Sequence, residues 1–190
     1  MTTNLFQQIR KFIELSANDE LVINKYINIL HLKKKEFLLQ NGKVCKEIYF
    51  VEKGCLRMFF INKKASEQIV QFALDGWWLS DYMSFMNNTP SDYYIQSIEE
   101  SVIVSINYQR FDELLNELPQ LERYFRIISQ KAVAASQHRS KLMYEMSKEE
   151  FYLHFSASFP EFMQRVPQFM IASYLGLTPE YMSELRKKKL

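Results

Sequence analysis

The pattern of apolar and polar positions changes twice along the chain. Up to about residue 27, apolar residues recur at helical spacing, which predicts two short amphipathic helices. From residue 28 to 107, short runs rich in β-branched and aromatic residues alternate with turn signals such as Asn41-Gly42 and Lys53-Gly54. Strands separated by turns about every 8–12 residues predict an antiparallel sandwich or barrel.

After Asn107 the apolar period is helical again. One helix is expected over 108–118, and Pro119 suits the first turn of the next helix. Neither Gly nor Pro follows before Met146, so this second helix is expected to run for roughly 28 residues, or about 40 Å. Apolar and small residues follow a 4-3-4-3 spacing along it, interrupted at Arg139, which is typical of a coiled coil. The seam residues are Leu121, Phe125, Ile128, Ala132, Ala135 and Leu142.

This stripe has two interpretations. In the first, it is the seam of a homodimer, and the small side chains of Ala132 and Ala135 let two helices approach closely. In the second, it packs on the chain's own β-domain. We favour the dimer, because a helix of this length extends beyond a β-domain of this size.

The C-terminal part carries the most specific motif of the chain. The pattern indicates a helix that ends at Gly176 and a second helix that begins with Thr178 as N-cap and Pro179 at its first position. A helix-turn-helix needs a small residue in its first helix, a glycine with positive φ at the turn, and an apolar anchor in its second helix. Ala172, Gly176 and Met182 meet these three requirements.

The exposed side of this second helix is expected to enter the major groove of double-stranded DNA. Its N-terminal side chains would meet base edges, and its basic end would meet phosphates. The expected contacts are Thr178, Glu180, Tyr181, Ser183, Arg186, Lys187 and Lys188. The glutamates repel phosphate, although a glutamate can accept a hydrogen bond from cytosine N4. A plain helical hairpin is the alternative interpretation.

Composition and charge narrow the class of protein. The chain has 190 residues, 47% of them hydrophobic, and a formal charge of +2, so a folded core can form. No apolar run approaches the roughly 18 residues of a membrane span, and no signal peptide is visible, so we expect a cytoplasmic protein. Residues 119–190 hold 11 Lys+Arg against 7 Asp+Glu, which favours a polyanion as partner, although ordinary surface scatter explains it equally well.

Catalytic chemistry is not indicated. The histidines His31, His138 and His154 do not cluster in the predicted strands, and no motif of a metalloprotease, serine hydrolase or nucleotide-binding loop occurs. Two cysteines are too few for a disulfide scaffold or a cysteine-held iron–sulfur cluster. We therefore expect no enzyme activity, no metal and no cofactor.

The order of these elements resembles the Crp/Fnr regulators over roughly residues 20–190. The resemblance depends on Gly42, Gly54 and Gly76 at the turns of the β-rich part, and on 171–176 with 178–180 in the C-terminal part. It implies an α+β fold with an N-terminal antiparallel double-stranded β-roll of jelly-roll type, a long dimerisation helix and a C-terminal helix-turn-helix of the winged-helix type. The corresponding domains are 1–118, 119–146 and 147–190. Relatives bind two-fold symmetric operators as dimers, often under control of a small ligand.

The ligand-binding segments depart from the family pattern. Nucleotide-binding relatives use Gly-Glu-Leu for the ribose, and Arg followed by Ser or Thr for the cyclic phosphate. Here 80–82 is Ser-Asp-Tyr and 91–93 is Ser-Asp-Tyr, and neither Lys nor Arg occurs between Lys64 and Arg110. Because an uncompensated buried ion costs several kcal/mol, we expect no binding of cyclic AMP in the family manner. Binding would be restored if a cation from the long helix, Lys131 or Arg139, reached the cyclic phosphate.

The ligand-binding segments of the β-rich part could still bind an effector of another kind. The candidate pocket residues are Trp77, Trp78, Ser80, Asp81, Tyr82, Ser91, Asp92 and Tyr93. Their aromatic content suits an apolar effector or none, and the alternative is that the aromatic residues are core of the β-roll. The sequence therefore predicts a dimeric DNA-binding transcriptional regulator, and the second hypothesis is a ligand-binding or protein-interaction module that has lost DNA reading.

Overall fold

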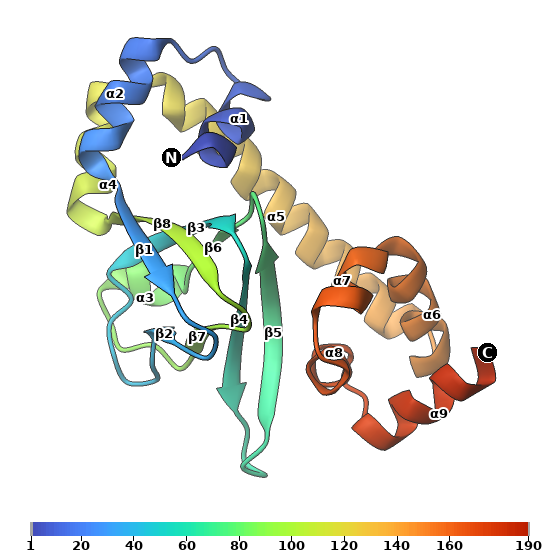
Figure 1. Cartoon of the computed structure of the whole chain (residues 1–190). Helices are drawn as coiled ribbons and strands as arrows, with labels where there is room; N and C mark the ends of the chain where they lie inside the picture. Colours follow the sequence, from blue (N-terminus) through green and yellow to red (C-terminus); the bar gives the residue numbers. More distant parts are fainter. Residues whose placement is uncertain (1, 190) are drawn as a thin grey trace. The chain divides into compact units, whose positions relative to one another are not determined.

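The computed structural model describes residues 2–189, and the side chains of residues 2–187 (Figure 1). The chain divides into two compact units. The first comprises Met1–Phe60 and Gln71–Ser129, and the second comprises Ile61–Val70 and Gln130–Leu190. The division passes through the long helix, whereas the sequence-based division at 118 and 146 treats that helix as a segment of its own.

Two four-stranded antiparallel sheets form the β-rich part within residues 2–189. The first has the order β1–β8–β3–β6 and the second β2–β7–β4–β5. The strands are β1 Asn28–Leu32, β2 Phe37–Leu39, β3 Glu47–Lys53, β4 Cys55–Ile61, β5 Glu67–Leu74, β6 Trp78–Leu79, β7 Tyr94–Ser97 and β8 Ser101–Asn107. We call residues 61–70, which join β4 to β5 and belong to the second unit, the hairpin tip.

Strand β3 lies in the interior of the first unit. Successive side chains of a strand point to opposite faces, and Ile48, Tyr49, Phe50 and Val51 are all buried. Ile48 and Phe50 belong to a core shared with the helices. Both faces of this strand are therefore covered.

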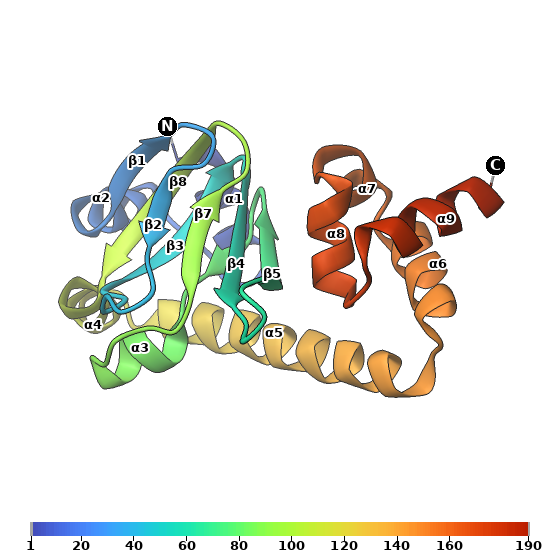
Figure 2. The ribbon, with the colours of Figure 1, turned by 90° about the horizontal axis from the view of Figure 1, so that it is seen from below.

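The helices of the first unit pack on one side of the first sheet (Figure 2). They are α1 Thr3–Arg10, α2 Ala17–Tyr26, α3 Tyr82–Asn87, α4 Tyr108–Glu117 and the first half of α5 Gln120–Glu145. Their core includes the fully buried Leu5, Ile23 and Leu114. Helix α2 begins at Ser16 with a capping box closed by Asp19.

The turn between β3 and β4 requires a glycine. Gly54 has φ +115°, and a Cβ atom placed there would lie 2.2 Å from Ser101 Oγ. Real side chains do not tolerate that separation, so β3 and β4 can turn this close to β8 only with glycine at this position.

The helices of the second unit are α6 Lys148–Ser158, α7 Pro160–Arg165, α8 Gln168–Leu175 and α9 Pro179–Lys189. Ser147 and Glu150 form a capping box at the start of α6. An aromatic core joins α6, α7 and α8, in which the Phe155 ring lies 6.0 Å from that of Phe162 and 5.7 Å from that of Tyr174. Within residues 2–189, no helix is both long and apolar enough for a bilayer.

Two of the six residues of the predicted dimer seam on α5, Leu121 and Leu142, are buried within the chain itself. Leu121 is buried in the core of the first unit, and Phe125 and Ile128 pack against the same core. Leu142 is buried in the second unit. The alternative interpretation, packing on the chain's own β-domain, accounts for Leu121, Phe125 and Ile128, and of the six residues only Ala132 and Ala135 are exposed.

Candidate functional site

Helices α8 and α9 form the predicted helix-turn-helix. Gly176 ends α8 in the left-handed region at φ 69°, and the Leu177 N–H donates to the Ala172 carbonyl oxygen at 2.9 Å. The Tyr181 N–H donates to Thr178 Oγ1 at 3.2 Å, so Thr178 is the N-cap of α9. Both local predictions, the positive φ of Gly176 and the cap at Thr178, are confirmed.

Burial orients the second helix of the motif. Ala172, Met182 and Leu185 are at most 3% exposed, and the small Ala172 side chain permits α9 to cross close to α8. The opposite side of α9 therefore faces outward. Thr178, Glu180, Ser183, Arg186 and Lys187 are exposed and Tyr181 is half-buried, whereas the side chain of Lys188 lies outside the described residues. This face presents two carboxylates near the start of α9 and two cations further along.

Arg139 of α5 holds the C-terminal end of α8. Its Nη2 donates to the Tyr174 carbonyl oxygen at 2.7 Å and its Nη1 to the Val70 carbonyl oxygen at 3.3 Å. Its guanidinium carbon lies 4.0 Å from the centre of the Tyr174 ring. Burial raises the pKa of the Tyr174 phenol, and the Arg139 charge opposes this rise. Sequence reasoning proposed Arg139 as a cation for the sensor pocket, but its guanidinium is engaged with the hairpin tip and α8.

Ser173 joins the same end of α8 to the hairpin tip. Its Oγ accepts a hydrogen bond from the Ile69 N–H at 3.0 Å and donates to the Glu67 carbonyl oxygen at 2.8 Å. The Gln68 side chain donates to the Ser173 carbonyl oxygen. These partners are more than 100 positions apart in sequence, so no local pattern predicts them.

Asp81 is the centre of the predicted sensor segment. Its Oδ1 accepts hydrogen bonds from the N–H groups of Met83 at 3.1 Å and Ser84 at 3.3 Å, which makes Asp81 the N-cap of α3. Its Oδ2 accepts the Ser91 hydroxyl at 2.6 Å. Asp81, Ser80 and Ser91 are all buried. The structure thus brings the two predicted segments together, but around a buried carboxylate that repels a bound anion.

The aromatic residues of this region have separate environments. The Trp78 N–H donates to the Tyr124 hydroxyl at 2.8 Å, and the Trp78 ring packs on Phe50 and Phe125. Burial raises the pKa of Tyr124 to about 12. Trp78 is therefore part of the core, whereas Trp77, Tyr82 and Asp92 are exposed and Tyr93 is half-buried.

A buried cation that sequence reasoning missed lies on β4. Arg57 is 6% exposed. Its Nε and Nη2 donate to Gln96 Oε1 at 2.9 and 2.6 Å, and its guanidinium lies 4.1 Å from the centre of the Phe59 ring. Gln96 is on β7, which follows the Ser91-Asp92-Tyr93 segment. Only the pairing of β4 with β7, in which Arg57 opposes Gln96, reveals this proximity.

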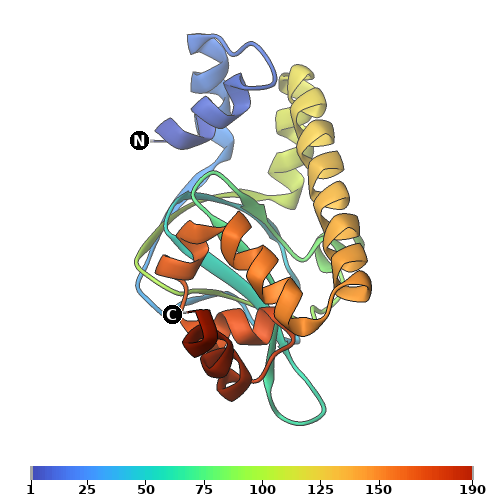
Figure 3. The same ribbon diagram turned by 90° about the vertical axis from the view of Figure 1, so that its right-hand side faces the viewer.

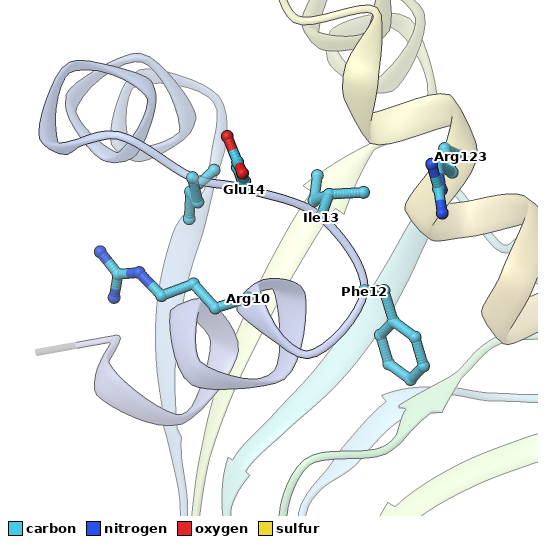
Figure 4. A pocket seen from close by; sticks show the side chains of 6 residues that line it. Arg10, Phe12, Ile13, Glu14 and Arg123 are labelled. Atoms are coloured by element: carbon cyan, nitrogen blue, oxygen red, sulfur yellow. The ribbon is translucent and has the colours of Figure 1, made fainter.

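Two hollows of the first unit lie away from these residues. An open groove of about 640 Å³ is lined by the loop between α1 and α2 and by α5. Figure 4 shows Ile13 of this loop directed toward Arg123 of α5. A second hollow of about 610 Å³ shares Ile13 and Arg123 with it and extends to Ser16 and Gln120. No predicted pocket residue lines either one. Within residues 2–189, there is also no group of three His, Cys, Asp or Glu side chains that could hold a metal ion.

Comparison with known sequences identifies relatives of this chain. Residues 29–117 match the family model described as cyclic nucleotide-binding domain. Transcriptional activator protein Anr of Pseudomonas protegens is 28% identical over 165 residues, covering 81% of this chain and 67% of that protein. The fumarate and nitrate reduction regulatory protein of Vibrio cholerae is 25% identical over 185 residues, covering 90% and 71%. These relatives are named as regulators rather than as enzymes.

Comparison with solved structures confirms the predicted fold. The regulator CLP of Xanthomonas campestris, described as responsive to c-di-GMP, gives a TM-score of 0.72 at 15% identity and covers 91% of both chains. FixK2 of Bradyrhizobium japonicum gives 0.69 at 15% identity, covering 85% of this chain and 83% of that one. The β-rich part followed by a long helix and terminal helices is thus a known arrangement.

Proposed function

Since this chain belongs to the Crp/Fnr family of transcriptional regulators, we propose that it binds double-stranded DNA as a homodimer, with α9 in the major groove. The observation that carries this proposal is the geometry of α8 and α9. A capped second helix crosses the first at a small residue and turns one side outward. A DNA-binding role also implies a cytoplasmic protein.

The proposed contacts with DNA are of two kinds, which lie at different positions along α9. Glu180, Tyr181 and Ser183, near the N-terminus of the helix, are proposed to meet base edges, because the N-terminal residues of a recognition helix reach deepest into the groove. Arg186, Lys187 and Lys188 are proposed to bind phosphates, which positions the helix without reading sequence. Thr178, the exposed cap, lies at the end of the helix where a phosphate is also favoured.

The dimer contact is proposed on an exposed face of α5 that includes Ala132 of the predicted seam. Every residue from Ser129 to His138 is exposed, although a bare helical stretch with apolar side chains normally has a partner. Met143 lies about 20° and Val133 about 100° round the helix from Ala132, and Val133 and Met143 are 57% and 51% exposed. A second copy of α5 packing there would cover them.

The sensor part is proposed not to bind cyclic AMP in the family manner. Asp81 supports this, because its buried carboxylate is already committed to α3 and to Ser91, and a cyclic phosphate would bring a second negative charge. The effector, if one controls the protein, is then of another chemical class. Calorimetry with cyclic AMP tests this, and binding in the micromolar range would refute it.

Selection of bound duplexes from a random DNA pool at low salt tests the proposed function. Enrichment of a two-fold symmetric motif, with half-sites about one helical turn apart, is the expected result. Without enrichment, the proposal of a dimeric reader fails under those conditions.

The second candidate function is a ligand-binding or protein-interaction module that no longer reads DNA. Glu180 and Glu184 favour it, because both are exposed on α9, where they oppose the approach of phosphates. Retention of the protein on nonspecific DNA or heparin at low salt distinguishes the two functions. The regulator is retained, and the module flows through.

A further inference from the structure

The hairpin tip is attached to the helix-turn-helix itself. Three of its residues contact the end of α8: Glu67 and Ile69 through the Ser173 hydroxyl, and Gln68 through the Ser173 carbonyl oxygen. Arg139 joins the Val70 carbonyl oxygen to that of Tyr174. A segment far from α8 in sequence is therefore part of the same unit as α8 and α9.

The turn at the end of this hairpin has a defined conformation. The Asn62 side-chain oxygen accepts hydrogen bonds from the N–H groups of Lys64 at 2.9 Å and Ser66 at 3.2 Å. The Ala65 N–H donates to the Asn62 carbonyl oxygen at 2.9 Å, and Ala65 has φ 55°. These bonds hold the backbone of Lys63 and Lys64 in place at the end of the hairpin.

Both lysines are exposed. The turn lies toward the same end of the second unit as α9, the lower end in Figures 1 and 3. Helix α9 carries Glu180 in its first turn and Glu184 near its middle, and both repel the DNA backbone. A DNA reader with an acidic recognition helix needs phosphate contacts from outside that helix, because cation–phosphate contacts supply most of nonspecific affinity.

From this attachment and charge, we infer that the turn of the β4–β5 hairpin is a second DNA-binding element of this protein. Lys63 and Lys64 bind backbone phosphates beside the half-site that α9 occupies. The hydrogen bonds of Ser173 and Arg139 hold the hairpin tip, and with it this turn, against the end of α8. The inference rests on the proposed function, since it concerns the same DNA complex. It adds a contact that is independent of base sequence.

The test is the salt dependence of binding to random-sequence duplexes. Binding of the full chain is measured by fluorescence anisotropy between about 50 and 200 mM salt. The double variant Lys63→Gln/Lys64→Gln is expected to bind every duplex more weakly. The slope of log affinity against log salt should fall by about 0.9 for each lost phosphate contact, which is about 1.8 for each protomer and about 3.6 for the homodimer. The double variant Lys63→Arg/Lys64→Arg is expected to keep both the affinity and the slope.

A matched control comes from the first unit. Lys33 and Lys34 are also adjacent and exposed, so Lys33→Gln/Lys34→Gln removes the same charge at another place and is expected to leave the slope unchanged. An unchanged slope in the Lys63/Lys64 glutamine variant, or an equal loss in the control, would overturn the inference while the proposed function stands. Failure of the unaltered protein to bind any duplex at low salt would overturn both.

Discussion

The guanidinium of Arg139 stacks on the Tyr174 ring, 4.0 Å from its centre, and donates to the carbonyl oxygen of the same residue at 2.7 Å. One side chain of the long helix thus binds both the ring and the backbone at the end of the first helix of the helix-turn-helix. A cation at this end of α8 also meets the negative end of the helix dipole. Arg139 is therefore a positioning residue for the helix-turn-helix.

Arg139→Ala is expected to lower the free energy of unfolding of the second unit by about 1–3 kcal/mol, because a charged hydrogen bond and a cation–π contact are lost together. Thermal unfolding followed by circular dichroism measures this. Lys141→Ala is the control, since Lys141 is exposed on the same helix and pairs with the exposed Glu145. Equal effects of the two substitutions would contradict the positioning role.

Gly54→Ala is expected to be strongly destabilising. The new Cβ would lie 2.2 Å from Ser101 Oγ at a φ of +115°, so strain in the backbone and overlap with β8 add to more than about 2 kcal/mol. Chemical denaturation measures the loss. Gly42→Ala is the matched control, because Gly42 also has positive φ but nothing lies within 4 Å of its Cβ position. It should cost about 1 kcal/mol.

Ala132→Glu is expected to weaken the proposed dimer. A carboxylate placed on that face of α5 would be buried against its own symmetry mate without a partner, which is costly. Analytical ultracentrifugation over a range of protein concentrations gives the dissociation constant. Ala134→Glu makes the same change at an exposed alanine about 200° further round the helix. If both variants dimerise equally well, the contact lies elsewhere.

The capping box of α6 is expected to make stability depend on pH below neutrality. Hydrogen bonds from Ser147 lower the pKa of Glu150 below its ordinary value of 4.5. Because the folded pKa is the lower one, this stabilisation is complete above the unfolded pKa and is lost as the pH falls through the folded pKa. Unfolding followed from pH 6 to about 3 should show the loss.

Glu150→Gln should remove that part of the pH dependence. Glu149→Gln, one position earlier and outside the capping box, should retain it. The opposite result, with Glu149 carrying the dependence, would show that the Ser147 contacts are not its source.

The features at the ends of the helices were predictable from the sequence. The cap at Thr178, the left-handed Gly176, and the capping boxes at Ser16 and Ser147 each depend on residues within about four positions of one another. Backbone sterics and side-chain hydrogen bonds over such short distances act in the same way in any fold. The alternation of short strands and turns likewise predicted the β-rich part.

The face of α5 that is covered was not predictable. A stripe with coiled-coil spacing indicates only that one side of a helix is apolar, and packing on its own domain satisfies Leu121 as well as a dimer would. The choice is made by the sheets and helices that surround α5. These assemble from residues far away in the chain.

The sequence by itself determined the elements, their order, their caps and the absence of cations from residues 65–109. These features depend only on residues that are close together along the chain. Only the tertiary structure decided that Arg57 lies against Gln96, that Asp81 receives the Ser91 hydroxyl, and that the hairpin tip is bound to Ser173. Contacts between distant positions depend on strand pairing and packing, whose register no local spacing encodes.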